Sequence, residues 1–577
     1  MYQYNDFDSR FVHQRAAQFR DQLTRHLEGT LGEEEFRALR LQNGWYVQRH
    51  APMLRVALPY GELNARQLRA LARIAREYDG KPGGMYAPRG GFGHLTTRQN
   101  VQFNWIELAD AADVMDLLAD VDMHGIQTSG NCIRNITSDC FAGVAADETV
   151  DPRPYCEILR QWSTLHPEFA FLPRKFKIAV SGADEDRAAT AWHDIGLQLK
   201  KNGSGEVGFE VRVGGGMGRT PIVGTVIRDF LPWREILVFI EAVVRVYNRY
   251  GRRDNIYKAR IKILVKAEGQ KFVDAVNAEF EAILERDVEG SAHLVSEAEF
   301  NRVAACFELP AGVVAVELEA SATHASKPAG YCRWLERNVH AHRLAGYRAV
   351  TLSLKRAGLP PGDATAEQMD LAADLAERFS HGELRVSHDQ NFVLPWVLAA
   401  ELPALWQAAR EAGFATPNIG YLTDMIACPG GDLCALANAR SIPIAASITE
   451  RFDDIDELHD IGDIDLHISG CINSCGHHHS GHIGILGVDK DGKEWYQISL
   501  GGSDGSAISG ASVPGKVIGP SFAADEVADV IESVIDTFKN QRAANELFID
   551  TVKRLGLDPF KASANAVRRS TATAKAT

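Results

Sequence analysis

The chain has 577 residues, too many for one ordinary hydrophobic core, and this length predicts three or four domains. Its hydrophobic content of 45% is that of a globular protein, and its net charge of −14 argues against a general nucleic-acid binder. No apolar run is long enough for a membrane span, and the N-terminus lacks an apolar signal core. We therefore expect a cytoplasmic protein that binds neither membrane nor nucleic acid.

The predicted elements fall into two similar series. Residues 1–50 are predicted to form a helical arm. Residues 51–115 form a small unit of strand, helix and strand, in which NARQLRALARIAREY is the helix, and residues 116–339 form a larger α/β unit. A second small unit covers 340–400 and a second larger unit covers 401–545. The tail, 546–577, becomes small and polar after Lys561 and is predicted to be partly disordered.

The two series are related by an internal repeat of about 288 residues. Gly93 matches Gly382 at an offset of 289, and three further pairs have an offset of 288: Gly182 with Gly470, Gly196 with Gly484, and Cys140 with Cys428. Coincidental recurrence of similar βα units is the alternative. The repeat predicts a duplicated α+β chain with pseudo-twofold symmetry and largely antiparallel sheets.

Four of the nine cysteines form a cluster in the second half. They are spaced Cys428-x5-Cys434 and Cys471-x3-Cys475. Structural zinc sites favour shorter spacings, whereas an iron–sulfur cluster accepts thiolates from irregular loops. The glycines beside these cysteines allow close backbone approach to an inorganic core. The pattern favours an iron–sulfur cluster over zinc or unligated thiols.

Several cations lie in segments that otherwise look like buried strands. Such cations are costly unless an anion pairs with them, so as a set they predict a site for a small dianion or a carboxylate-rich ligand. For any one of them, a surface cation or an ordinary salt bridge is the alternative. The residues are Arg55, Arg98, Arg134, Arg174, Lys175 and Lys177.

Together these motifs resemble the siroheme-containing sulfite and nitrite reductases, and the resemblance covers about residues 40–540. It is carried by Thr423–Cys434, by Gly470–Gly476 and by the cation-bearing segments. The resemblance implies two ferredoxin-like half-domains and two larger domains that bind siroheme and a [4Fe–4S] cluster. The assimilatory sulfite reductase hemoprotein is the most similar type.

The resemblance also implies roles for individual residues. Cys428, Cys434, Cys471 and Cys475 match the cluster ligands, and Cys475 matches the thiolate shared with the siroheme iron. Arg98 and Arg174 match positions that bind siroheme carboxylates, and Gln102 is a weaker candidate for that role. The positions that surround the substrate are matched by Arg55, Arg134, Lys175 and Lys177.

The resemblance predicts six-electron reduction of sulfite to sulfide, with six-electron reduction of nitrite to ammonia as the alternative. Lys177 favours sulfite, because plant-type nitrite reductases carry Asn at this position of LPRKFK. A non-catalytic iron–sulfur or haem protein would leave the cations unexplained. Electrons are expected from ferredoxin, or from a separate flavoprotein subunit, and 252–266 is a candidate basic docking face with a solvated helix and strand as the alternative.

Three further features remain open. The histidines of GHHHSGH, His477–His479 and His482, are predicted to pack near the cofactors, with a solvated loop or a separate metal as alternatives. The run VGGGMG at 213–218 is predicted to approach the macrocycle closely, with a plain turn as the alternative. Tyr46 is predicted to lie near the haem pocket, and Cys140 to be a packed thiol.

Overall fold

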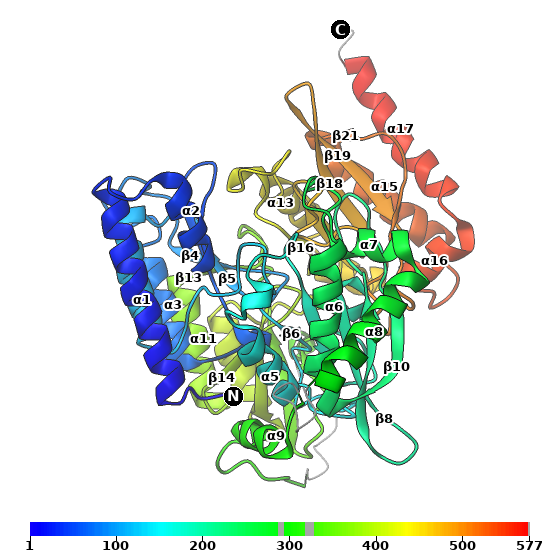
Figure 1. Ribbon diagram of the computed structural model, residues 1–577. Helices are drawn as coiled ribbons and strands as arrows, with labels where there is room; N and C mark the ends of the chain where they lie inside the picture. The colour runs from blue at the N-terminus through cyan, green and yellow to red at the C-terminus, as the bar shows by residue number, and fades with distance from the viewer. Residues whose placement is uncertain (287–293, 318–327, 575–577) are drawn as a thin grey trace.

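The computed structural model describes residues 1–286, 294–317 and 328–574, with side chains described up to Arg568. The chain folds as α+β, as predicted, with four sheets that form two similar pairs (Figure 1). None of the described helices combines the length and apolarity needed to cross a membrane.

Two five-stranded sheets are antiparallel throughout and have matching strand orders. The first has the order β1-β2-β5-β4-β13 and the second β11-β12-β15-β14-β3. Each sheet therefore ends with a strand from the other half of the chain, β13 in the first and β3 in the second. Their strands are β1 Trp45–Val47, β2 Pro52–Val56, β3 Glu62–Asn64, β4 Phe92–Leu95, β5 Val101–Phe103, β11 Val339–His340, β12 Tyr347–Leu352, β13 Asp363–Thr365, β14 Glu383–Val386 and β15 Phe392–Leu398.

The two larger sheets also match, and each mixes parallel and antiparallel pairs. The orders are β10-β9-β8-β7-β6 and β16-β17-β18-β19-β20, with β21 also paired to β19. The parallel pairs are β6–β7 and β7–β8 in the first sheet and β16–β17 and β17–β18 in the second, and the next pair in each, β8–β9 or β18–β19, is antiparallel. The strands are β6 Thr137–Ser138, β7 Ile178–Ser181, β8 Ile195–Lys201, β9 Val207–Val213, β10 Thr225–Pro232, β16 Ile426–Ala427, β17 Leu466–Ser469, β18 Ile483–Lys490, β19 Lys493–Leu500, β20 Lys516–Val517 and β21 Phe522–Ala523.

Helices cover the sheets in the same duplicated arrangement. In the first half they are α1 Asp6–Leu27, α2 Glu33–Gln42, α3 Ala65–Glu77, α4 Ala111–Ala119, α5 Arg153–Ser163, α6 Ile236–Tyr250, α7 Ile261–Glu268, α8 Gln270–Arg286 and α9 Glu297–Ala304. In the second they are α10 Ala329–Arg337, α11 Ala366–Phe379, α12 Leu402–Glu411, α13 Ile442–Arg451, α14 Ile455–Ile461, α15 Val527–Gln541, α16 Phe548–Leu555 and α17 Asp558–Ala574.

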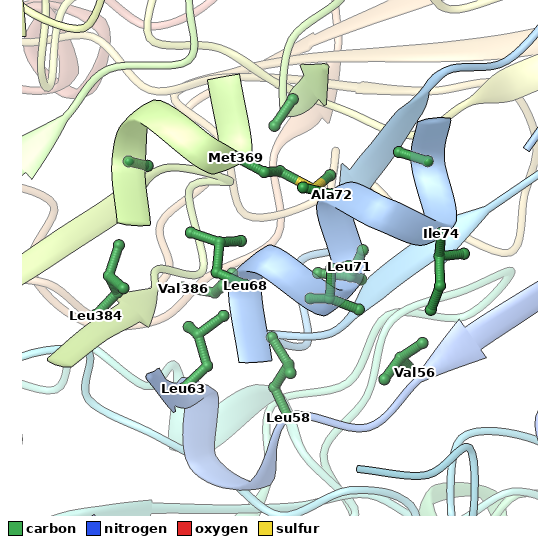
Figure 2. Close-up of a cluster of buried hydrophobic side chains, with 14 of the residues drawn as sticks. Val56, Leu58, Leu63, Leu68, Leu71, Ala72, Ile74, Met369, Leu384 and Val386 are labelled. Carbon is green, nitrogen blue, oxygen red and sulfur yellow. The ribbon is translucent and has the colours of Figure 1, made fainter. Parts of the chain in front are cut away.

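The helices α3 and α11 lie together at the centre of the duplication. Each begins with a capping box, Asn64 with Gln67 and Thr365 with Gln368, which satisfies the first free N–H groups. Their apolar stripes bury Leu68 and Met369 in one core that contains residues of both halves (Figure 2). The two small units therefore share a single hydrophobic core.

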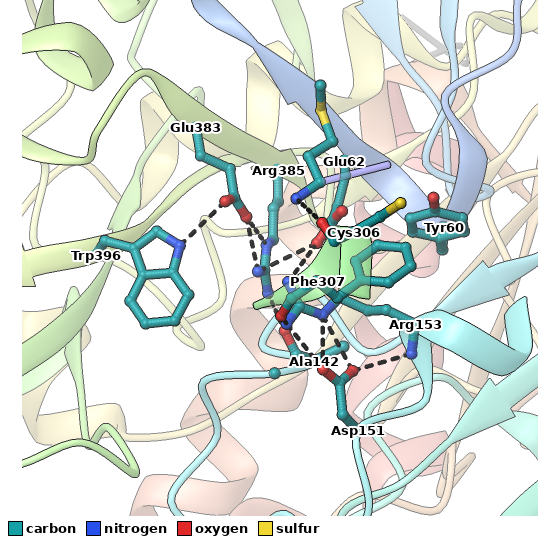
Figure 3. A network of polar contacts seen from close by, with 12 residues as sticks. Tyr60, Glu62, Ala142, Asp151, Arg153, Cys306, Phe307, Glu383, Arg385 and Trp396 are labelled. Carbon is teal, nitrogen blue, oxygen red and sulfur yellow. Dashed lines mark hydrogen bonds and ion pairs between the residues drawn. The ribbon is translucent and has the colours of Figure 1, made fainter. Parts of the chain in front are cut away.

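A buried ion network also ties the halves together (Figure 3). Glu62 of β3 lies opposite Arg385 of β14 in the sheet register, and its Oε1 also accepts Arg153 Nη1 at 3.1 Å. Arg385 binds Glu62 and Glu383, and Arg153 binds Asp151. Because removing one partner would leave a buried charge unpaired, this network favours the observed pairing of the halves.

Two predictions about the ends of the chain are wrong. Trp45–Val47 form β1 and pair with β2, so the helical arm ends before residue 50. The tail after Lys561 is not disordered up to Ala574, because it forms α17, which packs on α15. Its sequence is small and polar, but Phe560 and Ala564 provide a buried apolar face that fixes the helix.

We predict that Phe560→Ala will destabilise the protein by about 3–5 kcal/mol, because Phe560 is fully buried and contacts Phe548. The shift of the urea midpoint, followed by circular dichroism, would measure the loss. The exposed Ala562 on the same helix provides the control, and Ala562→Gln should leave the midpoint unchanged. Equal midpoints for both variants would contradict the packing of α17.

Candidate active site

The four cysteines of the cluster motif lie on two loops that strand pairing brings together. Cys428 follows β16, and its backbone N–H donates to the carbonyl of Ile468 in the parallel strand β17 at 3.1 Å. Cys471 and Cys475 follow β17. The Gly470 N–H donates to Cys428 Sγ at 3.2 Å, so a sulfur of one loop already contacts the backbone of the other.

Two glycines allow this close approach. A Cβ on Gly470 would lie 2.7 Å from Gly430 Cα and 2.5 Å from the Ala439 carbonyl oxygen. Gly430 has φ +60°, and a Cβ there would lie 2.4 Å from the Ser441 nitrogen. The cysteine loops can therefore meet only if both positions lack a side chain.

The donor set suits a cluster with several iron atoms. All nine cysteines are free thiols. In the described part of the chain, no three His, Cys, Asp or Glu side chains are placed to hold a single metal ion. A four-iron cluster separates its thiolates more widely than one tetrahedral ion does, so four free thiols on two adjoining loops fit the cluster better than zinc.

The backbone carbonyl of Thr128 gathers three of the site's side chains. It accepts hydrogen bonds from Arg134 Nη1 at 2.7 Å, Arg55 Nη1 at 3.1 Å and the Tyr46 hydroxyl at 3.3 Å. The Arg55 guanidinium also lies 5.4 Å from the centre of the Tyr46 ring. A carbonyl oxygen fixes these cations without cancelling their charge.

Gln102 fixes Arg55 from the neighbouring strand. The two residues are opposite each other in the β2–β5 register, and Arg55 Nη2 donates to Gln102 Oε1 at 2.9 Å. The Gln102 amide in turn donates to Asn104 at 2.8 Å. The structure gives Gln102 a role in orienting Arg55, and its predicted role as a siroheme ligand stays a prediction.

Arg98 lies in the turn between β4 and β5, against the cysteine loop. Its Nη2 donates to the carbonyl of Asn135 at 2.5 Å, and burial lowers its pKa to about 9. The neighbouring Thr97 hydroxyl donates to the carbonyl of Cys475 at 2.9 Å. A turn of the first half of the chain therefore contacts the backbone of Cys475 in the second half.

Lys175 and Lys177 precede β7 and complete the set. Desolvation, then nearby cations, lower the pKa of Lys175 to about 8 and hold the pKa of Lys177 well below its ordinary value. The Cys475 thiol opposes both pKa shifts, so its charge would favour the protonated form of both lysines. Desolvation, then the charges of Arg260 and Arg134, lower the pKa of Arg174.

We call these six residues the cation cradle: Arg55, Arg98, Arg134, Arg174, Lys175 and Lys177. Among the described residues, none of the six forms an ion pair with a carboxylate, whereas the adjacent Arg260 pairs with Asp194 at 2.7 Å. Arg98 Nε and Nη1 and Arg55 Nε are buried without a hydrogen-bond partner. Buried donors without partners and uncompensated positive charge fit an anionic ligand, as a carboxylate-rich macrocycle and an oxyanion would provide.

Three residues near the cradle were not predicted from the sequence. Arg260 and Lys262 belong to the segment 252–266, which the sequence offers as a candidate docking face. Lys262 is only 4% exposed, and its ammonium donates to the carbonyls of Gly216, Met217 and Thr220. That segment therefore turns two of its cations inward. His193 also lies here, and desolvation and Arg98 hold its pKa well below its usual value.

The Gly-rich run 213–218 lies beside the second cysteine loop. Gly216 and Gly218 have φ of +154° and +109°, and the Ile472 carbonyl oxygen lies 3.7 Å from a Cβ built on Gly218. The His479 ring contacts the Gly218 carbonyl at 3.0 Å. The run thus approaches the cysteine loop closely, and its contact with the macrocycle stays a prediction.

The histidine run is largely internal. His477, His478 and His482 are at most 9% exposed, so the solvated-loop alternative is wrong for them. Burial, then Lys177, hold the pKa of His477 well below its usual range, so its ring is neutral near pH 7. Cys140 is a packed thiol as predicted, since it is 7% exposed and burial raises its pKa.

Comparisons with known proteins agree with this arrangement. The model of the nitrite and sulphite reductase 4Fe-4S domain matches residues 129–284 and 422–569. The model of the nitrite/sulfite reductase ferredoxin-like half domain matches 46–83, 87–121 and 352–412.

Relatives named for nitrite and relatives named for sulfite have similar sequence identity to this chain. An assimilatory ferredoxin-dependent nitrite reductase of Haloferax mediterranei is 28% identical over 88% of this chain and 82% of its own length. A sulfite reductase [ferredoxin] of Mycobacterium tuberculosis is 26% identical over 88% and 83%. The solved structure of the Mycobacterium tuberculosis NirA protein superposes with a TM-score of 0.72 at 24% identity and covers 92% of each chain, which shows the same fold.

We predict that Gly470→Ala will reduce iron and acid-labile sulfide in the purified protein several-fold, because the added methyl group would push the two cysteine loops apart. Gly203→Ala is the matched control, since no atom lies within 4 Å of a Cβ there. Full iron content in the Gly470 variant would contradict the close loop contact.

Proposed function

Because the chain belongs to the nitrite and sulfite reductase family, we propose that it reduces sulfite to sulfide with six electrons at the site described above. Its cofactors are siroheme and a [4Fe–4S] cluster. Cys428, Cys434, Cys471 and Cys475 would hold the cluster, and Cys475 would also bind the siroheme iron. When bound, the two cofactors supply the electrons for the reduction.

The cation cradle would divide between cofactor and substrate. Arg98 and Arg174 would bind siroheme carboxylates. The substrate would lie among Arg55, Arg134, Lys175 and Lys177, whose fixed charges hold an oxyanion and stabilise the charge that develops on its departing oxygens. Lys175 has a pKa of about 8 and can donate a proton near neutral pH, as the loss of oxygen as water requires.

Lys177 is the observation that carries the choice of sulfite. It has no carboxylate partner in the described chain, and Arg98 and Lys175 help to hold its pKa below the ordinary value, so an anionic ligand would favour its protonated form and gain positive charge suited to the more highly charged oxyanion. Nitrite is the second candidate, because the Haloferax mediterranei relative is named for it. Steady-state kcat/KM for sulfite and for nitrite, with reduced methyl viologen as donor, would decide between them.

We propose ferredoxin as the electron donor, because relatives named as ferredoxin-dependent match most of the chain. A separate flavoprotein subunit is the alternative. Reduction of the holoenzyme by purified ferredoxin and by a flavoprotein reductase would separate these donors. The cytoplasmic location expected from the sequence remains a prediction.

We predict that Lys177→Asn will lower kcat/KM for sulfite by about tenfold or more and will lower that for nitrite less, because an unpaired cation near the substrate is worth about 1.4 kcal/mol or more. Both cofactors should remain bound. The exposed Lys201 provides the control, and Lys201→Asn should change neither value. Equal losses for the two substrates would show that Lys177 does not set the preference.

We predict that kcat/KM for sulfite will fall as pH rises through about 8, where Lys175 loses its proton and the cradle loses one charge. Well below pH 8, Lys175 stays protonated, so its titration causes no change of kcat/KM with pH. Lys175→Arg retains its proton at higher pH, so the decline should move upward. An unchanged profile in that variant would assign the decline to another group.

We predict that Cys475→Ser will disrupt the cluster and siroheme together, because one thiolate serves both. Iron content and the siroheme absorption bands would report the two losses separately. Cys140→Ser is the control, since Cys140 lies among apolar side chains in another core cluster. A Cys475 variant that retained both cofactors in coupled form would contradict the shared-ligand assignment.

A further inference from the structure

The strand that leads into the first cysteine loop lies at the edge of its sheet. This strand, β16, has β17 as its neighbour, and the sheet ends on its other side. The Cys428 N–H donates to the carbonyl of Ile468 in β17, so the N–H and carbonyl of the preceding residue, Ala427, point away from β17. Ala427 is buried, and buried backbone groups need hydrogen-bond partners.

The side chain of Gln390 binds both of these groups. Its Oε1 accepts the Ala427 N–H at 2.9 Å, and its Nε2 donates to the Ala427 carbonyl at 3.0 Å. Gln390 is itself buried in the turn between β14 and β15 of the second small sheet. Its amide therefore takes the place of a further strand and ties the end of β16 to that sheet.

The first small sheet fixes the position of this amide. Gln390 Nε2 also donates to the Leu95 carbonyl of β4 at 2.7 Å, and the Leu95 N–H donates to the Gly362 carbonyl at 2.8 Å. Gly362 has φ +79°, and a Cβ there would lie 2.8 Å from Gln390 Cβ. The close approach of the Gln390 side chain thus requires glycine at this position.

A buried histidine and aspartate orient the amide. His94 and Asp363 are opposite each other in the β4–β13 register, and His94 Nδ1 lies 2.7 Å from Asp363 Oδ1. His94 Nε2 lies 3.1 Å from Gln390 Nε2, so one tautomer satisfies both contacts, with Nδ1–H as donor and Nε2 as acceptor. Burial raises the pKa of Asp363 and the His94 hydrogen bond lowers it, so the pair favours a carboxylate acceptor. An amide turned by half a rotation would place its oxygen against the Nε2 lone pair, so His94 selects the orientation that binds Ala427.

This series of contacts ends at the Cys428 sulfur. His94, Asp363 and Ala427 line one cavity with Cys428, and its volume of about 10 Å³ leaves room for about one water molecule. Cys428 Sγ accepts the Gly470 N–H at 3.2 Å and lies 3.5 Å from the Ser441 hydroxyl. The position of Ala427 determines where Cys428 begins, and so determines the geometry of these contacts.

We propose that Gln390, oriented by His94 and Asp363, is a positioning residue for the cluster ligand Cys428. By fixing Ala427, it fixes the hydrogen bond from the Gly470 N–H to the Cys428 sulfur. Hydrogen bonds to the sulfurs stabilise the more negative, reduced form of a cluster and so raise its reduction potential. This inference rests on the proposed function for the role of Cys428 as a ligand.

The test compares two buried glutamines that lie in matching turns of the two halves, both with positive φ: Gln390 and Gln99. Gln99 donates to the Val386 carbonyl at 3.1 Å and accepts the Ser138 N–H at 3.0 Å, and neither residue is next to a cysteine of the cluster motif. Methionine has a similar volume and lacks the amide. Gln390→Met is therefore the test variant, and Gln99→Met is its matched control.

Two measurements on the holoenzyme report the effect. In Gln390→Met, a redox titration followed by electron paramagnetic resonance should give an equilibrium constant for one-electron reduction of the cluster at least tenfold lower, equivalent to a midpoint lower by about 59 mV. Hydrogen–deuterium exchange of the Ala427 N–H should be at least tenfold faster. Gln99→Met should change neither value, although it should speed exchange at Ser138. Unchanged values in a folded Gln390→Met protein, or equal shifts of potential in both variants, would overturn the inference.

A second variant covers the case in which Gln390→Met does not fold. His94→Leu with Asp363→Val replaces the buried pair by apolar side chains, which avoids an unpaired buried charge. Gln390 then loses the group that orients it, so the equilibrium constant for reduction should fall at least threefold. Melting temperature and siroheme absorption would report folding. An unchanged potential in this folded variant would also overturn the inference.

Failure of the proposed function would be visible separately. Cys428→Ser should lose iron and acid-labile sulfide, and full iron content in that variant would contradict the ligand assignment. The exchange rate of the Ala427 N–H reports the hydrogen bond to Gln390 whichever residues bind the cluster. No substrate is present in these measurements, so the choice between sulfite and nitrite does not affect them.

Discussion

Uncompensated positive charge in the cation cradle is the constraint on which the rest of the site depends. None of its six cations pairs with a carboxylate in the described chain, and the cations lower one another's pKa values. Desolvation of such a set is unfavourable unless hydrogen bonds hold the groups and an anion neutralises them. Here backbone carbonyls, above all that of Thr128, satisfy the donors and leave the charge available.

Holding these charges requires both halves of the chain. The first half contributes the cations and the second contributes the thiols, and the Thr97–Cys475 hydrogen bond joins the two. Two features fix the position of one half relative to the other. The small sheets exchange the strands β3 and β13, and Glu62 forms buried ion pairs with Arg153 and Arg385. A slip between the halves would separate cations from sulfur and leave buried charges unpaired on both sides.

Duplication gave this protein two equivalent frameworks, and the side chains have diverged in opposite directions. Equivalent turns carry Arg98 and Asp389, and equivalent strand ends carry Lys177 and Asp465. Backbone geometry was retained in both halves because the sheets require it. The side-chain charges differ because the hydrogen bonds that define these turns and strand ends are made by the backbone.

The sequence by itself determined the duplication, the α+β class, the grouping of the four cysteines and the set of six cations, because periodicity, spacing and buried charge are local signals. Only the tertiary structure decided that β3 and β13 exchange sheets, that Gln102 orients Arg55, and that Lys262 turns inward. Each depends on contacts between segments far apart in the chain, which no local pattern encodes. The same reason explains the tail. Its polar composition predicts disorder, but Phe560 packs into the core beside α15.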